Sequence, residues 1–319
     1  MNNLMKTKKK RRKRKAKKNF KYIIGIVALL LLIGCIGYYG INEIIFISNF
    51  NKEKAQIGKE KAQISKEETQ EVKEVDYLAK VPEEVKNSND PVIQTLLKKV
   101  NNNPNVSMIL SDINSYPREL IELASEKDET IDFVANYPNY DASTNKVIST
   151  KKDYKKGQIP LFIQWDERWG YEKYGSDFIA INGCGPTSLA MVAAGLTGNK
   201  DINPKVVAEF SDENGYLVEG VGSSWTLMTE GAGHFGLKSK ELPLTEDAII
   251  STLKKGQPII ASMGPGTFTS GGHYLVLTGV DDNNKIIIND SDSKIRSSQT
   301  WDIDVFMKET ENLWTFTAM

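Results

Sequence analysis

The chain has 319 residues, and its 41 basic and 41 acidic residues give a formal net charge of zero. Twelve of the basic residues lie within residues 1–21, which contain no acid, so the rest of the chain carries 29 basic against 41 acidic residues and a net charge of −12. A basic tail alone could be a nucleic-acid-binding arm, but the segment that follows the tail argues against a nucleic-acid partner.

Residues 23–41 form an uncharged, apolar run directly after the basic tail. As a helix this run would be about 28 Å long, which is close to the thickness of the hydrocarbon core of a bilayer. Because the twelve basic residues of the tail precede the run and no charged residue lies within it, we expect a single-pass protein of the cell membrane. Residues 1–22 would form a cytoplasmic tail and residues 23–41 a transmembrane helix, with the rest of the chain extracellular.

The sequence Leu32-Ile33-Gly34-Cys35 offers an alternative anchor, because it resembles a bacterial lipobox that would be cleaved before Cys35 and lipidated there. The long basic tail and the apolar residues after Cys35 favour an uncleaved helix instead. With Cys35 in the membrane, the outer part has a single thiol and can form no internal disulfide. Two cysteines and two histidines then cannot build a zinc site, and we expect neither metal nor cofactor.

Residues 42–75 contain a repeat of period seven. The segment KEKAQIG at 52–58 is followed by KEKAQIS at 59–65 and by a decayed copy at 66–72. Lys and Glu at this spacing support a helix. Each copy offers only one Ala and one Ile, two positions apart, so no continuous coiled-coil seam forms. We expect a solvated, charged helical spacer, with a weak coiled coil as the alternative.

Residues 76–157 have the pattern of a small helical region followed by a linker. Pro91 and Pro117 each stand near a helix start with apolar residues at helical spacing behind them, and the sequence NNNPN at 101–105 breaks the pattern between them. The linker at 151–156 is rich in lysine. No pattern here indicates chemistry, so we expect a role in support, spacing or partner docking.

From residue 158 to residue 319 the pattern is typical of an α+β domain. Residues 160–165 indicate a short strand or an extended segment, and residues 184–194 indicate an apolar helix that ends at Gly195 and Gly198. Strands are expected at 258–263, 273–280 and 285–289, where Val and Ile are frequent. The sequence DDNN at 281–284 predicts a turn that joins the last two strands into a hairpin.

Cys184 is the candidate nucleophile of this domain. Lone cysteines are usually buried and inert, but Gly183 and Gly185 flank this one and leave its sulfur unscreened. Pro186 occupies a position typical of the first turn of a helix, which places Cys184 near the N-cap. There the helix dipole and the free N–H groups favour the thiolate.

His273 opens the second of the expected strands, and a hairpin turn centred between residues 282 and 283 would place acids beside it. In that register Leu275 faces Asp290, so that His273 and Asp290 are diagonal neighbours on one sheet face, about 7 Å apart at the backbone. His273 itself faces Asp292, whereas Asn289 points to the opposite face. The register excludes Asn289 as the group that orients His273, leaves Asp290 and Asp292 both open, and would change with a bulge.

Four segments occur in a fixed order in this domain: QWDERW at 164–169, GCGPTSLAM at 183–191, GHY at 272–274 and IND at 288–290. Together they resemble the C39-like group of papain-type cysteine peptidases. The resemblance implies a papain-like α+β fold, in which a helix carries the cysteine and an antiparallel sheet carries the His and the Asp. It implies Cys184 as nucleophile, His273 as base and Asp290 as the residue that orients the base. Gln164 would complete the oxyanion hole together with the backbone N–H of Cys184.

The chain departs from this family at Ser291, which stands where a proline usually follows the aspartate and could leave that aspartate less firmly held. Nothing resembles a Walker A motif, so the transporter-linked members that cut double-glycine leaders are a poor guide to the substrate. We expect a membrane-anchored, extracytoplasmic cysteine peptidase that cleaves a peptide bond through an acyl-enzyme. The alternatives are an amidase or acyl transferase that acts on cell-wall peptide with the same triad, and a catalytically silent binding module.

Overall fold

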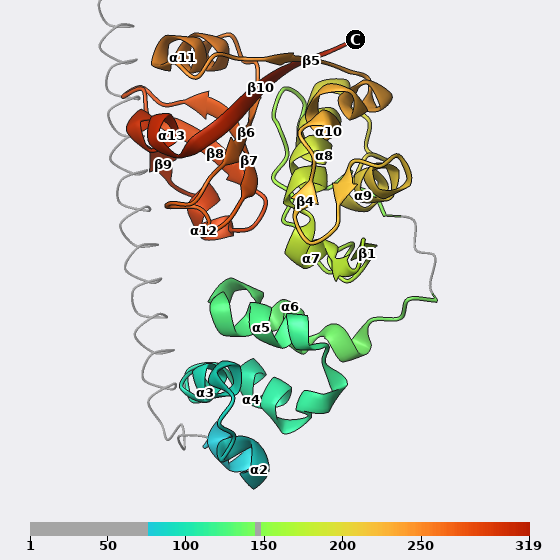
Figure 1. Ribbon diagram of the computed structural model, residues 1–319, viewed down its shortest axis with the longest axis vertical. Coiled ribbons are helices and arrows are strands. Elements are labelled where there is room, and N and C mark those ends of the chain that lie inside the picture. Colours follow the sequence, from blue (N-terminus) through green and yellow to red (C-terminus); the bar gives the residue numbers. More distant parts are fainter. Residues whose placement is uncertain (1–75, 144–147) are drawn as a thin grey trace, which may run out of the picture. The chain divides into compact units, whose positions relative to one another are not determined.

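The computed structural model describes residues 76–143 and 148–319. The predicted tail at 1–22, the transmembrane helix at 23–41 and the spacer at 42–75 lie outside the described residues. Within the described ranges, no helix combines the length and the apolar composition that crossing a membrane requires. Residues Asp76–Met319 group into one compact unit by their contacts (Figure 1).

The first part of this unit consists of short helices joined by tight turns. They are η1 (Tyr77–Lys80), α2 (Glu83–Lys86), α3 (Pro91–Leu97), α4 (Pro104–Ser111), η2 (Ile113–Ser115), α5 (Arg118–Glu126), η3 (Asp128–Thr130), α6 (Ile131–Ala135) and η4 (Tyr137–Asn139). The expected helix start at Pro91 is confirmed, with Asp90 as its N-cap, and α5 begins one residue after Pro117. A helix that was not expected begins within the predicted break at 101–105: Asn103 is the N-cap of α4, and Pro104 is the first residue of this helix.

The second part contains the remaining helices and all the strands of the described residues. The helices are α7 (Ile179–Asn182), α8 (Cys184–Thr197), α9 (Pro204–Glu213), α10 (Thr226–Thr229), η5 (Gly231–Phe235), α11 (Glu246–Lys254), α12 (Lys294–Ser297) and α13 (Ile303–Glu309). The strands are β1 (Lys173–Tyr174), β2 (Asp177–Phe178), β3 (Leu217–Val218), β4 (Gly222–Ser223), β5 (Leu237–Glu241), β6 (Ile259–Met263), β7 (His273–Val280), β8 (Ile286–Asp290), β9 (Thr300–Trp301) and β10 (Thr310–Ala318). Residues 159–163 belong to no strand, so the extended alternative holds for the start of this part.

Helix α8 is longer than the sequence pattern predicts. It continues through Gly195 to Thr197 and ends at Gly198, which takes the left-handed conformation with a φ of 72°. Gly195 lies inside the helix because another segment crosses it closely: a Cβ at this position would lie 2.6 Å from the Cδ1 of Ile159. The glycine that suggested a helix end is therefore a packing glycine.

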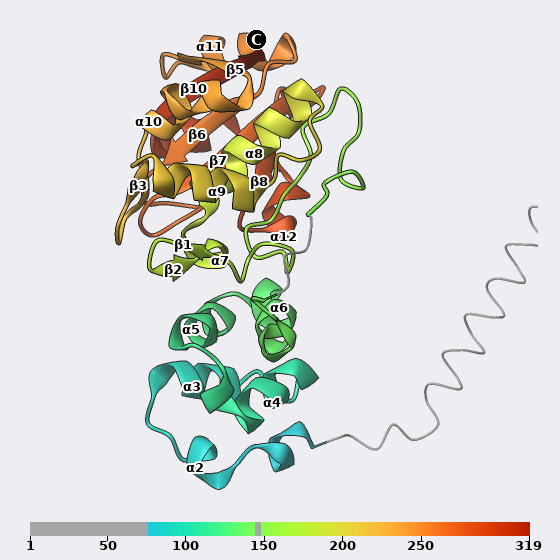
Figure 2. The same cartoon turned by 90° about the vertical axis from the view of Figure 1, so that its right-hand side faces the viewer.

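Six strands form an antiparallel sheet in the order β5-β10-β6-β7-β8-β9. Figure 2 shows α8 and α9 lying along one side of this sheet. The three expected strands are confirmed to within one residue at their ends as β6, β7 and β8. Strands β5 and β10, which complete the sheet on the other side of β6, were not expected.

The β7–β8 hairpin has the expected register at Asp290, but its loop and a bulge in β7 differ from the expectation. Beside the turn, the strands are offset by one residue from the expectation, because the loop has three residues, 282–284, and Asn284 takes the left-handed conformation with a φ of 59°. A bulge at Thr278 then shifts the register back. The two irregularities cancel, so the expected pairing of Leu275 with Asp290 is confirmed.

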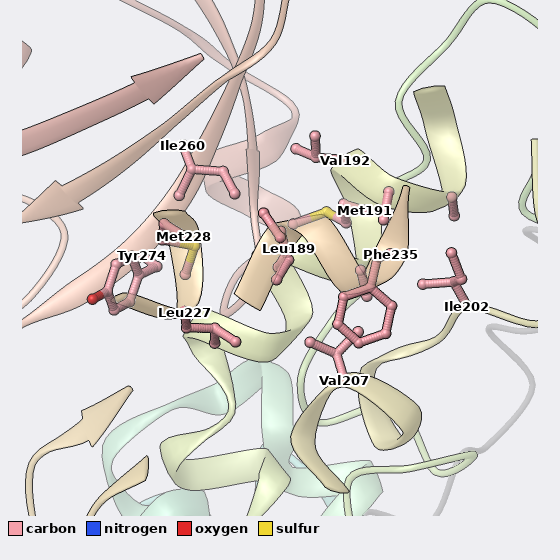
Figure 3. Close-up of a cluster of buried hydrophobic side chains, with 14 of the residues drawn as sticks. Leu189, Met191, Val192, Ile202, Val207, Leu227, Met228, Phe235, Ile260 and Tyr274 are labelled. Atoms are coloured by element: carbon pink, nitrogen blue, oxygen red, sulfur yellow. The ribbon is translucent and has the colours of Figure 1, made fainter. Parts of the chain in front are cut away.

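Neighbouring residues of β7 pack into two different hydrophobic clusters, one on each face of the sheet. Val276 belongs to the cluster that includes Leu189 and Met191 of α8, which Figure 3 shows beside Ile260 of β6. Leu277 belongs to the second cluster, with residues of α11 and α13. Helix α8 thus packs against the sheet through buried apolar side chains, and its first residue lies near the start of β7.

A third hydrophobic cluster joins the helical region to the sheet-containing part. Its members from α4 to α6 include Leu110, Leu120 and Phe133, and they pack together with Trp165 and Tyr171. The tyrosine is fixed further, because its hydroxyl donates to the carbonyl oxygen of Phe133 over 2.5 Å. The two parts therefore share a hydrophobic core. The domain boundary near residue 158 remains a prediction.

Candidate active site

Cys184 is the first residue of α8, and its thiol is free and partly exposed. Close packing requires both flanking glycines: a Cβ on Gly183 would lie 2.4 Å from the carbonyl oxygen of Ile179, and one on Gly185 would lie 2.4 Å from the Oγ of Ser223. The first N–H groups of a helix have no intrahelical acceptor, and together with the helix dipole they favour an anion. The position of Cys184 therefore suits a thiolate.

His273 is the first residue of β7, and its ring is buried. Its Nε2–H donates to Oδ1 of Asp290 over 2.8 Å, which leaves Nδ1 as the ring nitrogen available to a second partner. Cys184 lies close enough to this ring to raise the pKa of His273. The start of β7 is tied to α8, because the hydroxyl of Ser188 donates to the carbonyl oxygen of Tyr274 over 3.2 Å.

Asp290 is the last residue of β8 and has no exposed surface. Its Oδ1 accepts from His273 and from the N–H of Asp292, each at 2.8 Å, and its Oδ2 accepts from Nε of Arg296 at 2.5 Å. The sequence register left Asp290 and Asp292 both open as partners of His273. The structure brings Asp290 to the imidazole, whereas the carboxylate of Asp292 forms ion pairs with Lys127 and Arg296.

The charges around His273 and Asp290 favour the ionised form of both side chains. Burial lowers the pKa of His273, but the charge of Asp290 and the hydrogen bond to it outweigh burial and raise that pKa to about 10. Burial raises the pKa of Asp290, but His273 and Arg296 outweigh burial and hold that pKa below its ordinary value. An imidazolium in this place can balance a thiolate on Cys184, which is the reactive pair of a thiol nucleophile.

Gln164 lies beside this cluster, but its amide group is engaged elsewhere. Its Nε2 donates to the carbonyl oxygens of Ala180 at 2.9 Å and Ile181 at 3.2 Å, and its Oε1 accepts from the hydroxyl of Ser291 at 3.3 Å. The side chain is buried and connects the segment before α8 with the segment after β8. Because its amide hydrogens point at carbonyl oxygens, the expected donation to an oxyanion requires the side chain to rotate.

Ser291 is held by hydrogen bonds where the family usually has a proline. Its hydroxyl is buried and contacts Oε1 of Gln164 at 3.3 Å and the carbonyl oxygen of Tyr274 at 3.2 Å. Its own carbonyl oxygen accepts from the backbone N–H of Gln164 at 2.7 Å. These contacts, in place of a proline ring, fix the segment that follows Asp290.

Arg296 belongs to the cluster although the sequence pattern did not single it out. It lies on α12, six residues after Asp290, and its guanidinium forms ion pairs with Asp290 and Asp292. The available signal was the spacing of four residues between Asp292 and Arg296. That spacing is common on exposed helix surfaces, and nothing in the sequence indicated that this arginine turns inward.

The β3–β4 hairpin lies next to the start of α8. The carbonyl oxygen of Ser223 accepts from the hydroxyl of Tyr274 at 2.9 Å, and the Ser223 hydroxyl is 2.7 Å from the hydroxyl of Tyr174. Two apolar side chains of this segment reach solvent, with exposed fractions of 81% for Val221 and 46% for Trp225. The segment that includes the β3–β4 hairpin therefore exposes apolar side chains, and its Ser223 contacts Tyr274, the residue after His273.

The comparisons with known proteins place the cluster within a family match. The model of the Peptidase_C39 like family matches residues 156–318, which include Gln164, Cys184, His273, Asp290 and Arg296. Among solved structures, the crystal structure of the peptidase domain of Streptococcus ComA, a bifunctional ABC transporter involved in a quorum sensing pathway, is similar. The sequence identity is 19% and the TM-score is 0.35, with 43% of this chain and 93% of that chain covered. No curated protein matches the chain.

Proposed function

The chain belongs to the C39-like peptidase family, and we propose that it is a cysteine peptidase in which Cys184 is the nucleophile, His273 the base and Asp290 the orienting residue. One observation carries the proposal: His273 hydrogen-bonds the carboxylate of Asp290 over 2.8 Å and lies close enough to Cys184 for this residue to raise its pKa. A nucleophile, a base and a third group that orients the base are the parts that thiol hydrolysis needs.

The first half of the reaction forms a thioester. The thiolate of Cys184 attacks the carbonyl carbon of the scissile amide, and the electron pair of the carbonyl bond moves onto its oxygen. As this pair returns, the imidazolium of His273 gives its Nδ1 proton to the amide nitrogen, the C–N bond breaks and the amine leaves. Asp290 holds the Nε2–H, which keeps Nδ1 directed at the reacting atoms.

The second half of the reaction hydrolyses the thioester. Neutral His273 takes a proton from water at Nδ1, the hydroxide oxygen adds to the carbonyl carbon, and the C–S bond breaks. The carboxylic acid leaves, and the thiolate and imidazolium are restored. The backbone N–H of Cys184 has no acceptor within α8, so it can donate to the oxyanion in both halves. A rotated Gln164 amide would supply the second donor.

We place this peptidase on the outer face of a membrane. The basic residues before residue 22 and the apolar run at 23–41 support this location. A peptide is the first substrate to test there, and cell-wall peptide is the second, because that location would bring both within reach of Asp76–Met319.

The test of the proposed function is peptide cleavage by the full chain. Cys35→Ser leaves Cys184 as the one thiol, since the chain has two cysteines. We expect this variant to cleave members of a peptide library, with products identified by mass spectrometry, and Cys184→Ala to abolish cleavage. Cleavage that persists in Cys184→Ala would reject Cys184 as the nucleophile. Peptide binding without any cleavage would instead support a silent binding module.

A further inference from the structure

The carboxylate of Asp290 is shared between two cationic groups from different elements. Its Oδ1 accepts from His273 at 2.8 Å and its Oδ2 from Arg296 at 2.5 Å. The Asp290 side chain has no exposed surface, and that of Arg296 is 24% exposed. One negative charge therefore faces two positive groups where little water is present, so the guanidinium offsets part of the charge that acts on His273.

Arg296 is held by the short helix α12. Its backbone N–H donates to the hydroxyl of Ser293 over 3.0 Å, and its carbonyl oxygen accepts from Nε1 of Trp301 at 3.1 Å. The hydroxyl of Ser297, the next residue, accepts from the backbone N–H of Asp290 at 2.8 Å. Helix α12 is thus fastened to the end of β8.

Glu129 of the helical region supports the other end of α12. Its Oε2 accepts from the N–H groups of Lys294 at 2.9 Å and Ile295 at 3.1 Å, and its Oε1 accepts from the hydroxyl of Ser293. A carboxylate on the first N–H groups of a helix stabilises that helix. The views in Figures 1 and 2 both place α12 beside the helical region. A residue far away in the sequence therefore caps the helix that carries Arg296.

Lys127 of the helical region makes a second connection to the same segment. Its ammonium forms an ion pair with Asp292, whose carboxylate also contacts Arg296 at 3.4 Å. The backbone of Asp292 is fixed as well, because its carbonyl oxygen accepts from Nε1 of Trp165 at 3.0 Å. The helical region thus contacts the Asp290–Arg296 segment at both a carboxylate and a helix start.

The charge that acts on His273 matters for its proposed chemistry. A group that gives up a proton in one half of the reaction and takes one up in the other works best with a pKa near the working pH. The groups that act on His273 are Asp290 and Cys184, and those that act on Asp290 are His273 and Arg296. Without the guanidinium, the full charge of the carboxylate would face the imidazolium and hold its proton more tightly.

We propose that Arg296 is a positioning residue of the active site, which fixes the rotation of the Asp290 carboxylate and limits the negative charge that it presents to His273. The helical region, through Glu129 and Lys127, keeps Arg296 in this place, and is thereby part of the active-site architecture. The catalytic meaning of this inference rests on the proposed function, whereas its geometry can be tested without a substrate.

The test is the titration of the His273 ring by NMR in the full chain. The chain has two histidines, so the ring signals of carbon-13-labelled His234 and His273 can be resolved, and His234 serves as the internal reference. In a Cys184→Ala background, which removes the sulfur as a neighbour of the imidazole, we expect Arg296→Gln to raise the His273 midpoint by about 1 pH unit. Arg296→Lys keeps the charge and should leave the midpoint near that of the background. Asp290→Asn should lower it.

Glu129→Gln tests the role of the helical region through the sign of the shift. Loss of a negative charge by itself would lower the His273 midpoint, because the imidazolium loses a distant counter-charge. Release of Arg296 from Asp290 would raise the His273 midpoint, because the guanidinium would no longer offset the charge of the Asp290 carboxylate. We expect a rise that is smaller than that of Arg296→Gln. Glu126→Gln is the matched control, since it removes the same charge from an exposed side chain nearby, and no shift is expected.

Each outcome decides one part of the inference. A midpoint that falls or stays constant in Arg296→Gln would contradict the role of Arg296. A fall or no change in Glu129→Gln, or an equal shift in Glu126→Gln, would contradict the role of the helical region. Should Arg296→Gln not fold, the Glu129→Gln titration carries the test alone. Failure of the unsubstituted chain to cleave peptides would reject the proposed function and leave these titrations unaffected.

Discussion

Nε2 of His273 lies 2.8 Å from Oδ1 of Asp290, and two backbone irregularities bring these side chains together. The three-residue loop at 282–284 offsets the strands by one residue, and the bulge at Thr278 reverses the offset. A shift of one residue moves a side chain to the other face of a sheet. Either irregularity alone would therefore turn Asp290 away from His273.

Replacement of Asp290 by Asn is expected to lower both activity and stability. The amide can still accept a hydrogen bond from His273, but it carries no charge to balance the imidazolium or Arg296. We expect kcat to fall on the order of 10³-fold and the free energy of unfolding to fall by about 3 kcal/mol, because Arg296 loses a buried partner. Peptide cleavage kinetics and urea unfolding measure the two effects, and an unchanged kcat would contradict the role of Asp290.

The same pair should make the stability depend on pH in two directions. The pKa of Asp290 lies below its ordinary value of 3.8 in the folded chain, so its contribution is present above about pH 4 and is lost as the pH falls further. The pKa of His273 is raised from 6.5 to about 10, so its contribution is complete below about pH 6.5 and is lost as the pH rises toward 10.

The stability difference between the unsubstituted chain and Asp290→Asn should therefore be greatest between about pH 4 and pH 6.5. Urea unfolding of both chains over a pH series measures this difference. A difference that is constant from acid to alkaline pH would show that the pair does not titrate as the structure indicates.

Gln164→Ala separates a structural from a catalytic role of this side chain. Loss of its bonds to the carbonyl oxygens of Ala180 and Ile181 should lower the free energy of unfolding by about 2 kcal/mol. If the amide rotates to the oxyanion during the reaction, kcat also falls by about 10²-fold or more while KM changes little. Ser291→Ala is the control, because it removes a contact of the same amide. Equal effects of both variants on kcat would leave Gln164 with a structural role alone.

Gly185→Ala tests the packing around the nucleophile. The added Cβ would lie 2.4 Å from the Oγ of Ser223, so the β3–β4 hairpin or α8 must move. We expect a loss of about 1–3 kcal/mol in stability together with slower peptide cleavage. Gly233→Ala is the matched control, since its Cβ would meet nothing closer than 3.7 Å. Full activity in Gly185→Ala would show that this contact does not position Cys184.

The parts of the site that lie on regular elements could be predicted from sequence. The start of α8 at Cys184 and the face of β8 that carries Asp290 follow from helix-start residues and from the period of two in strands. Asn289 points away from His273 as expected, and its amide donates to the carbonyl oxygen of Ile159 at 3.1 Å. These features depend on local pattern, which a sequence displays directly.

The parts that depend on contacts between distant segments could not be predicted. The expected register was right, although the loop and the bulge that produce it were not foreseen. Arg296 turns inward on a short helix whose first N–H groups donate to Glu129, more than 160 residues earlier. The bonds of Gln164 to the segment before α8 likewise depend on how two loops meet. Secondary-structure propensity and residue spacing carry no information about contacts between such distant segments.

The central claim is an activated thiolate at Cys184, and the rate of its alkylation against pH tests the claim most directly. Iodoacetamide labelling of the full chain with Cys35→Ser reports on this thiol alone, because the chain has two cysteines. Below pH 7, we predict that Cys184 is labelled faster than a free model thiol, and that His273→Ala slows it to the rate of that thiol. Labelling no faster than the model thiol below pH 7 would contradict the account.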